Sequence, residues 1–333
     1  MNEKELRKEL IKHYERCDLC PWGCGVNRYK ERGICLLGSA ANIFYEGILY
    51  GDELCIIPTY GIFFAGCNLR CVFCEYGEYQ EKPDCIYDKK LEDLKIKLKR
   101  RDYKSISFIG GEPSLNPLAI AEILSHDEII DAKKILNTNL YFSKCNMEIL
   151  NEMIDIYIAD IHFGNNICAE RFAGAINYYD IIMDNINYIY HCSSKELIIR
   201  HLLLPGHLDC CFKVIVEALS KNGVINNFSL LTNYHPWYRA HYFDDINRMI
   251  SAEEATEAKE ILIKYGIKMI GDKEINTWKG TGSSVEDEDN EIIIDSEGRI
   301  IIPYLTKEMV LFAEGLVPED DKIKKIKKLI TKG

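Results

Sequence analysis

TYGIFFAGCNLRCVFC, residues 59–74, joins an apolar run to a group of three cysteines. The first half is apolar nearly throughout, as expected for a strand that is buried on both faces of a parallel sheet. The second half places Cys67, Cys71 and Cys74 within eight residues. The sequence therefore predicts three thiols in the loop after a buried strand, which is the edge where a β/α barrel builds its active site.

Downstream of this segment, short β-rich runs alternate with longer helical stretches, a pattern typical of βα units. Asn116-Pro117 and the capping box Ser251-x-x-Glu254 each predict a helix start, and Gly266 predicts a helix stop. The expected strands are residues 59–65, 105–109, 133–138, 156–161, 197–204, 228–233 and 267–270. We therefore expect an α/β fold, a partial (β/α)6 barrel of the TIM type.

The composition along the chain divides it into three expected parts. These are an N-terminal helix with a cysteine-rich metal-binding segment at 1–55, the βα core at 56–271 and a C-terminal extension at 272–333. In the extension, the Glu297-Gly298 turn between two apolar runs predicts a β-hairpin. The basic stretch 322–332 predicts a solvated terminal helix, and contact with an acidic partner or a membrane surface is the alternative.

The overall composition is that of a folded globular protein, with 333 residues, 47% of them hydrophobic and 28% charged. No apolar run reaches the length of about 18 residues that a membrane span needs, and the charged start lacks the features of a secretory signal. We therefore expect a cytoplasmic protein without a membrane span. Because Asp+Glu 52 exceed Lys+Arg 41, giving a net charge of −11, nucleic acid is not an expected partner.

The chain has 14 cysteines, which in a reducing compartment indicate metal ligands or buried thiols rather than disulfides. Seven of them lie in two groups with ligand-like spacing. The other seven are expected to act as small apolar core residues: Cys55, Cys85, Cys145, Cys168, Cys192, Cys210 and Cys211. A role of Cys168 or Cys210 as a hydrogen donor is an alternative.

The N-terminal group, Cys17-x2-Cys20-x3-Cys24-x10-Cys35, supplies four soft ligands within 19 residues. Four thiolates form a complete set for tetrahedral Zn²⁺ and equally for an all-protein 4Fe-4S cluster. The spacing therefore predicts a closed metal centre that is structural or relays electrons. It leaves zinc and iron open.

The second group, Cys67, Cys71 and Cys74, supplies only three thiolates. A 4Fe-4S cluster has four irons, so three cysteines leave one iron open for a substrate or cofactor. A zinc site completed by a distant His or Cys is the alternative.

Residues 67–74, CNLRCVFC, resemble the signature of radical S-adenosylmethionine (SAM) enzymes, with the usual aromatic residue before the last cysteine. Residues 110–113 resemble the GGEP turn of that family, and residues 137–139 resemble its TNG-type segment with Asn139 in place of Gly. The resemblance implies a radical SAM barrel, a 4Fe-4S cluster, SAM, and a low-potential electron donor such as flavodoxin or ferredoxin. The residues it assigns to SAM are Gly110, Gly111, Glu112, Asn137, Asn139, Asp160, His162 and Arg200.

The chain also resembles the subgroup of pyruvate formate-lyase activating enzymes and their uncharacterised relatives, over about residues 15–265. In that subgroup the strand ending at Asp160 commonly reads Asp-x-Lys, whereas this chain has His162, a group that ordinarily titrates near neutrality. Arg200 is similar to an arginine expected to face the methionyl carboxylate, with an internal ion pair as the alternative. The uncharacterised relatives share the N-terminal four-cysteine segment, which the best-known activating enzyme lacks.

The resemblance implies an oxidoreductase-type radical enzyme that cleaves SAM to a 5′-deoxyadenosyl radical. The radical would abstract hydrogen from a protein or peptide, either to activate a glycyl radical enzyme or to modify a side chain. The same chemistry on a small molecule and a non-catalytic iron-sulfur electron carrier are the alternatives. His235, in the aromatic segment 234–239, is expected to gate the substrate or to pack as part of a loop, and no catalytic side chain is assigned.

Overall fold

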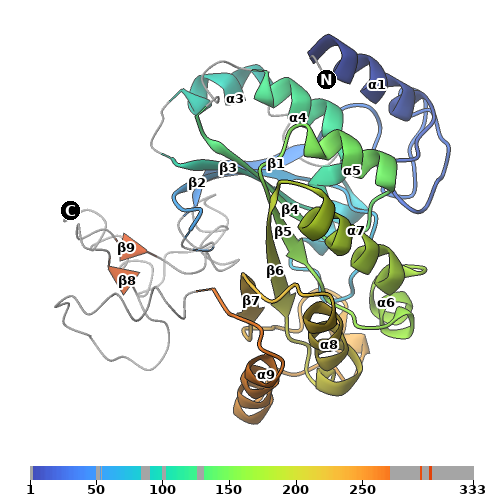
Figure 1. Ribbon diagram of the computed structural model, residues 1–333. Helices are drawn as coiled ribbons and strands as arrows, with labels where there is room; N and C mark the ends of the chain where they lie inside the picture. The colour runs from blue at the N-terminus through green and yellow to red at the C-terminus, as the bar shows by residue number, and fades with distance from the viewer. Residues whose placement is uncertain are drawn as a thin grey trace, which may run out of the picture.

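The computed structural model describes residues 3–49, 53, 55–83, 91–99, 103–125, 131–270, 293–294 and 300–301. The main body is a seven-stranded sheet whose strands follow one another in chain order, with helices along one side of it (Figure 1). Consecutive βα units give this order because each crossover returns to the neighbouring position in the sheet. Within the described residues the two edge strands do not pair, so the barrel is partial, as the sequence predicted.

Six strands, β2 to β7, run parallel, and β1 pairs antiparallel with β2. Their bounds are β1 Ile43–Leu49, β2 Thr59–Phe64, β3 Ser105–Gly110, β4 Lys133–Thr138, β5 Ile156–Asp160, β6 Glu196–Leu202 and β7 Phe228–Leu231. The six parallel strands confirm six of the predicted runs. The seventh run, 267–270, forms only an isolated parallel bridge between Met269 and Phe228, so its prediction as a strand is wrong.

Strand β1 was not predicted from the sequence. It lies at an edge of the sheet and its middle residues are only half-buried, so it lacks the apolar run that marks the inner strands. Because β1 belongs to residues 1–55 and joins the sheet of the following part, the sheet draws on both sides of that boundary. The division into three parts stays a prediction.

The helices connect the strands, and the predicted end signals are present. Ser251 accepts a hydrogen bond from the Glu254 amide and the Glu254 side chain accepts one from the Ser251 amide, which confirms the capping box of α9. Asn116 precedes Pro117 at the start of α4, and Gly266 follows α9 with φ +70°. The bounds are α1 Glu3–Glu15, α2 Gly77–Glu81, α3 Leu91–Leu98, α4 Pro117–Leu124, α5 Lys144–Asn151, α6 Asn166–Ala173, α7 Tyr178–Cys192, α8 Lys213–Lys221 and α9 Ala252–Lys264.

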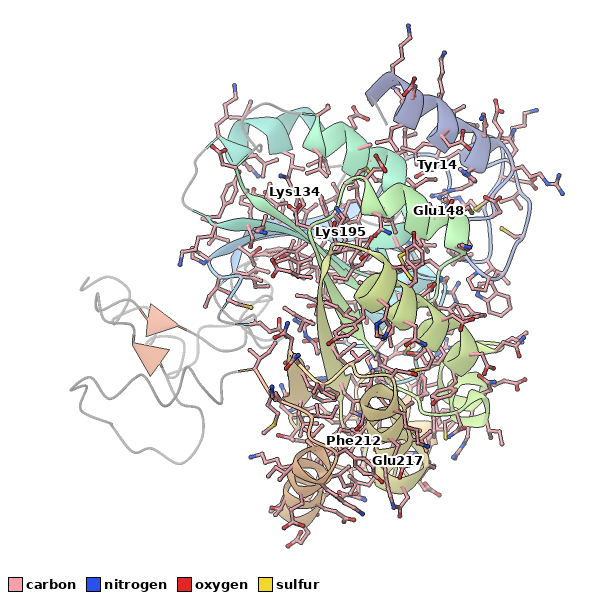
Figure 2. All side chains as sticks on the ribbon, viewed as in Figure 1. Tyr14, Lys134, Glu148, Lys195, Phe212 and Glu217 are labelled. Carbon is pink, nitrogen blue, oxygen red and sulfur yellow. The ribbon has the colours of Figure 1, made fainter. Side chains whose placement is uncertain are left out.

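The two faces of the sheet carry different cores. The outer face packs against the helices through a large apolar cluster in which Phe212 is fully buried (Figure 2). The inner face carries a small set of isoleucines, Ile135, Ile156, Ile158 and Ile198, which pack against Ile56 and Ile57. Because side chains alternate along a strand, the next inward positions toward the carboxyl edge are Asn137, Asp160 and Arg200. The fold therefore places a polar layer directly above an apolar floor.

The C-terminal strands β8 (Ile293–Ile294) and β9 (Ile300–Ile301) pair antiparallel, as expected for the two arms of the predicted hairpin. The Glu297-Gly298 turn and the basic stretch 322–332 lie outside the described residues. Among the described residues, no helix combines the length and apolar character required to cross a bilayer.

Candidate active site

Residues 66–74, here called the cysteine loop, follow β2 at the carboxyl edge of the sheet and carry Cys67, Cys71 and Cys74. Cys67 and Cys71 are buried and Cys74 is half-buried. Removal from water raises the pKa of Cys74 to about 12 and raises the pKa of the other two thiols as well. Thiols with raised pKa values stay protonated at neutral pH unless a bound cation stabilises their thiolate forms. Because metals bind thiolates, a metal is the kind of cation that would do so.

Hydrogen-bond donors point at two of the three sulfurs. The Leu69 amide lies 3.4 Å from Cys67 Sγ, and Asn139 Nδ2 lies 3.6 Å from the same atom. Gln80 Nε2, from α2, donates to Cys74 Sγ. Such N–H donors to thiolate sulfur are one of the means by which proteins set the reduction potential of an iron-sulfur cluster.

The glycines of residues 110–113 bring the end of β3 against the backbone of the cysteine loop. A Cβ atom on Gly110, whose φ is +109°, would lie 2.4 Å from the Phe64 carbonyl oxygen, and one on Gly111 would lie 2.2 Å from that of Gly66. The Gly111 and Glu112 amides donate to these same two oxygens, at 2.7 and 2.9 Å. Residues 110 and 111 must therefore be glycine, because any side chain there would collide with the backbone of Phe64 and Gly66, at the start of the cysteine loop.

Glu112 is completely buried and its carboxylate accepts three hydrogen bonds. The donors are the Ser114 amide at 3.1 Å, Thr138 Oγ1 at 2.7 Å and the Asn139 amide at 2.8 Å. Burial raises the pKa of Glu112, and these donors partly offset the rise. Glu112 therefore ties the end of β3 to the end of β4 and fixes Asn139 beside Cys67.

A half-buried charge network occupies the inner face below the cysteine loop. Arg200 donates to Glu53 through Nε at 2.9 Å and Nη2 at 2.6 Å, and its Nη1 lies 3.7 Å from Asp160 Oδ2. In the amide orientation that satisfies both neighbours, Asn137 donates to Asp160 and accepts from Arg200. Burial raises the pKa of Asp160 to about 6, although the Arg200 charge opposes the rise. The internal ion pair that the sequence left open for Arg200 is present, with Glu53 as its partner.

A sequence model of the radical SAM superfamily matches residues 62–219, which include the cysteine loop and the whole network except Glu53. The chain belongs to the radical SAM superfamily. It is 37% identical over 286 residues to the uncharacterized protein MJ0674 of Methanocaldococcus jannaschii, covering 81% of each chain. It is 30% identical over 186 residues to the 7-carboxy-7-deazaguanine synthase of Methanothermobacter thermautotrophicus, covering 54% of this chain and 68% of that one.

Among solved structures, this radical SAM chain is similar to a domain of the pyruvate-formate lyase-activating enzyme from Bacteroides vulgatus. The two share 22% sequence identity with a TM-score of 0.40, over 50% of this chain and 96% of that one.

Membership of the superfamily implies a 4Fe-4S cluster and SAM, and the donor set fits the cluster. Three thiols come from a single loop at the active edge of the barrel, and N–H donors reach two of the sulfurs. Within the described part of the chain, groups of three or more ligand atoms within 4.8 Å of one another occur elsewhere and do not include these thiols. The sulfurs of the cysteine loop are therefore spread more widely than the ligands of one small ion.

His162, a residue type that ordinarily titrates near neutrality, has a lowered pKa in this fold. Packing takes its ring out of water, and together with the Arg200 charge this lowers its pKa to about 4. The ring lies edge-on to Phe73 at 5.5 Å, and its Nδ1 is buried without a hydrogen-bond partner among the described residues. Where the resembled subgroup commonly has lysine, this chain therefore has a ring whose charged form is disfavoured, and a contact of His162 with SAM stays a prediction.

The aromatic segment 234–239 packs against the cysteine loop. The Arg239 amide donates to the Val72 carbonyl at 2.7 Å, and the Tyr238 ring covers Gly77, where a Cβ atom would lie 2.6 Å from that ring. Tyr234 is buried, whereas His235 is exposed beside Trp237 with 5.5 Å between ring centres. The segment thus has the loop-packing role, and gating by His235 stays a prediction.

The N-terminal cysteine segment lies against the cysteine loop as well. Cys17, Cys20 and Cys35 are buried and Cys24 is exposed. Burial raises the pKa of Cys17 to about 11 and that of Cys20 to about 12, and the neighbouring thiols add to both shifts. Trp22 Nε1 donates to the Asn68 carbonyl at 2.8 Å, which joins the two cysteine segments directly.

Two residues of this site were not identified from the sequence. Glu53 pairs with Arg200 across 147 positions of the chain, a separation that no local pattern reveals. Gln80 is detectable only as a polar residue that becomes buried on a short helix after Cys74. Both act on residues that the sequence did identify.

The interpretation of the scattered cysteines as core residues is wrong for Cys55, Cys192 and Cys210, which are exposed. Cys192 is the last residue of α7, where an apolar neighbourhood in the sequence does not ensure burial. Cys211 is buried as expected, Cys145 and Cys168 are half-buried, and Cys85 lies outside the described residues.

Proposed function

We propose that this radical SAM enzyme cleaves SAM reductively and directs the radical to a protein or peptide, either to activate a glycyl radical enzyme or to modify a side chain. The observation that carries the proposal is the cysteine loop, with three thiols for a cluster that needs four ligands. When bound, a 4Fe-4S cluster with one open iron binds SAM and supplies the electron that cleaves it. Cys67, Cys71 and Cys74 would hold it.

The charge balance of the inner face suits SAM, which carries a sulfonium and an ammonium group against one carboxylate. Two carboxylates, Glu53 and Asp160, surround the single guanidinium of Arg200. We assign Asp160 and Asn137 to the methionyl ammonium group, because Arg200 is engaged by Glu53 and its charge favours the ionised form of Asp160. Gly110, Gly111 and Glu112 are positioning residues that set the loop and Asn139, and His162 contributes an uncharged ring beside SAM.

Aromatic rings under the cysteine loop would keep water from the reacting atoms. Phe73 contacts the rings of His162, Phe163 and Tyr234, with centre distances of 5.5, 6.1 and 5.9 Å. Excluding water matters because a primary carbon radical must meet the substrate hydrogen before any other.

A macromolecular substrate is supported by exposed apolar side chains in the segment that backs the cysteine loop. Trp237, Tyr242 and Met249 are 36, 74 and 45% exposed, and all lie between β7 and α9. Large aromatic side chains and methionine are enriched where proteins bind proteins. This surface could therefore dock a polypeptide next to the loop.

A small-molecule substrate is the second candidate, favoured by one comparison. The relative from Methanothermobacter thermautotrophicus, with 30% identity, is named a 7-carboxy-7-deazaguanine synthase. If this chain shares that substrate class, its target is a metabolite and the exposed aromatic residues only pack loops.

For the N-terminal segment we propose a second, closed metal centre held by Cys17, Cys20, Cys24 and Cys35. Its contact with the cysteine loop through Trp22 suits an electron relay. Its four sulfurs, like those of the cysteine loop, are not in the groups of ligand atoms that lie within 4.8 Å of one another in the described residues, a spread that favours a 4Fe-4S cluster over Zn²⁺. We further propose flavodoxin or ferredoxin as the electron donor and a cytoplasmic location.

The test is anaerobic incubation of the reconstituted full chain with dithionite and SAM, with 5′-deoxyadenosine measured by liquid chromatography. Release of 5′-deoxyadenosine supports the proposed enzyme. If no 5′-deoxyadenosine is released, the result supports the alternative of a non-catalytic electron carrier. Deuterated candidate substrates then separate the two substrate classes. Deuterium that enters 5′-deoxyadenosine from a peptide or glycyl radical enzyme supports our proposal, and transfer only from a small molecule contradicts it.

A further inference from the structure

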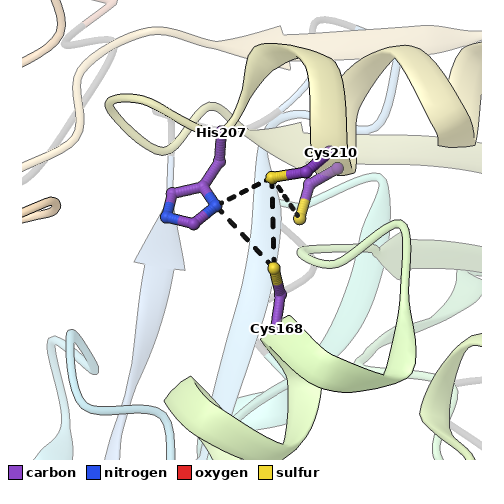
Figure 3. A group of neighbouring side chains, drawn as sticks. Cys168, His207 and Cys210 are labelled. Atoms are coloured by element: carbon purple, nitrogen blue, oxygen red, sulfur yellow. Dashed lines mark hydrogen bonds between the residues drawn. The ribbon is translucent and has the colours of Figure 1, made fainter.

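Four potential metal ligands converge from two segments at the carboxyl edge of the sheet (Figure 3). Cys168 lies on α6, after β5, and His207, Cys210 and Cys211 follow β6. One ligand atom of each lies within 4.8 Å of every other. We refer to these four residues as the four-ligand cluster.

The spacing of the four-ligand cluster is that of a single tetrahedral ion. Cys168 Sγ lies 4.0 Å from Cys210 Sγ and 3.8 Å from His207 Nδ1, and Cys210 Sγ lies 3.9 Å from Cys211 Sγ. His207 Nδ1 and Cys210 Sγ are 3.1 Å apart. Zn–S bonds of about 2.3 Å at tetrahedral angles place two sulfurs roughly 3.8 Å apart, so small adjustments would seat the ion.

The backbone around the four-ligand cluster directs the side chains inward. His207, Cys210 and Cys211 are spaced i, i+3 and i+4, which puts them on one helical face. The segment Leu208–Phe212 is a π-helical turn, in which the Cys211 and Phe212 amides both donate to the His207 carbonyl, at 3.1 and 3.2 Å. Such turns are frequent at functional sites.

Asn165 connects the two segments through hydrogen bonds. Its side chain accepts from the Cys168 amide at 2.8 Å and donates to the Cys210 carbonyl at 2.7 Å and to Cys168 Sγ at 3.3 Å. Next to it, a Cβ atom on Gly164 would lie 2.3 Å from the Cys211 carbonyl, so the two backbones approach closely. The ligands are thus held in place by the fold.

The histidine has the surroundings of a metal ligand. Its Nδ1 faces the sulfurs, whereas its Nε2 lies 3.5 Å from Asp245 Oδ2. Asp245 is itself held by two hydrogen bonds from Arg171. A carboxylate behind the second ring nitrogen is the usual support of a metal-bound histidine, because it fixes the ring and its tautomer.

We propose that Cys168, His207, Cys210 and Cys211 bind one Zn²⁺ ion in a closed structural site. On binding, the three thiols release their protons to water and the imidazole binds in its neutral form through Nδ1, with no change of oxidation state. The ion would join the segment that follows β5 to the segment that follows β6. Strand β5 carries Asp160, and strand β6 carries Arg200. A 4Fe-4S cluster fits less well, since its four thiolates bind different irons and stand farther apart.

Site-resolved alkylation of the full-length chain tests the proposal without any mutation. The anaerobic, chelator-treated protein is incubated with or without Zn²⁺ alone, treated with iodoacetamide and analysed by peptide mass spectrometry. Zn²⁺ should lower the alkylation rate of exposed Cys210 at least ten-fold, and that of Cys168 and Cys211 with it. Exposed Cys192, outside the four-ligand cluster, should react equally in both samples. An unchanged rate at Cys210, or protection through a Cys168–Cys210 disulfide instead, would overturn the proposal.

Zinc content gives a second, independent readout. The double variant Cys168→Ser/Cys210→Ser should hold one equivalent of zinc less than the matched variant Cys55→Ser/Cys192→Ser, with equal iron content after reconstitution. Equal zinc in the two variants would contradict the proposal. Because the comparison is between variants, zinc at the N-terminal cysteines does not affect it.

Discussion

The cysteine loop and the four-ligand cluster lie at the same edge of the sheet and differ in how their ligands are supplied. The loop offers three thiols from one segment of eight residues. The four-ligand cluster offers three thiols and one imidazole from two segments 39 to 43 residues apart in the sequence. Under the two proposals, the incomplete set from one segment leaves a metal open to chemistry, whereas the complete set from two segments fastens the fold.

The largest expected effect is on SAM cleavage when a loop thiol is removed. Cys71→Ala should lower 5′-deoxyadenosine release about 1,000-fold or more, equivalent to roughly 4 kcal/mol, because the cluster loses one of its three protein ligands. Cys210→Ala should retain most of the activity, because the four-ligand cluster has no chemical role in this account. A Cys71→Ala variant with wild-type release would remove the distinction between the two sites.

Zinc should stabilise the folded chain by binding to complete sets of four ligands such as the four-ligand cluster, and not by binding to the three thiols of the cysteine loop. At a free Zn²⁺ concentration about 100 times its Kd, the stabilisation of the folded state is about 3 kcal/mol. This increment, measured by thermal unfolding of the full chain, should be smaller in His207→Ala than in wild type. It should be unchanged in Cys71→Ala. An equal increment in wild type and His207→Ala would contradict the prediction.

Replacing the buried Glu112 should lower the free energy of unfolding, because its carboxylate links the ends of β3 and β4. Glu112→Ala leaves the buried Ser114 and Asn139 amides and the Thr138 hydroxyl without their acceptor, which should cost about 2 to 3 kcal/mol of unfolding free energy. Urea unfolding measures this cost, with exposed Glu122→Ala as the control. A cost below that of the control would show that the carboxylate does not tie β3 to β4.

The smallest expected effect is a pH dependence at Asp160. Its pKa is raised to about 6 in the fold from an ordinary value of 3.8, so ionisation destabilises the folded state. The cost is absent below pH 4, grows between pH 4 and 6 and is complete above that range. Since the side chain is 25% exposed, we expect about 1 to 2 kcal/mol. Asp160→Asn should flatten this part of the stability curve, and an unchanged slope would contradict the assignment.

Much of the fold follows from local sequence signals. Strands β2 to β7 are apolar runs, and the start of α9 is fixed by two residues three positions apart, so both are detectable in short windows. Strand β1 is missed because its middle residues are half-buried and it lacks that pattern, whereas residues 267–270 show the pattern and yet form only a bridge at Met269. Whether these edge segments form strands depends on pairing between residues far apart in the chain, which a short window of sequence does not contain.

The candidate site divides in the same way. The cysteine loop is evident because its ligands are neighbours in sequence. The Glu53–Arg200 pair and the meeting of Cys168 with Cys210 depend on contacts across 147 and 42 positions. The one local signal for the four-ligand cluster was the spacing of His207, Cys210 and Cys211, which only a helical turn converts into a common face.

Mössbauer spectroscopy of the ⁵⁷Fe-reconstituted chain, in a Cys17→Ala/Cys20→Ala background that removes two N-terminal ligands, tests the central claim most directly. Addition of SAM should change the spectrum of one iron in four, the iron without a cysteine ligand, and leave the other three as they were. A spectrum that SAM does not alter would mean that the metal held by Cys67, Cys71 and Cys74 has no open position.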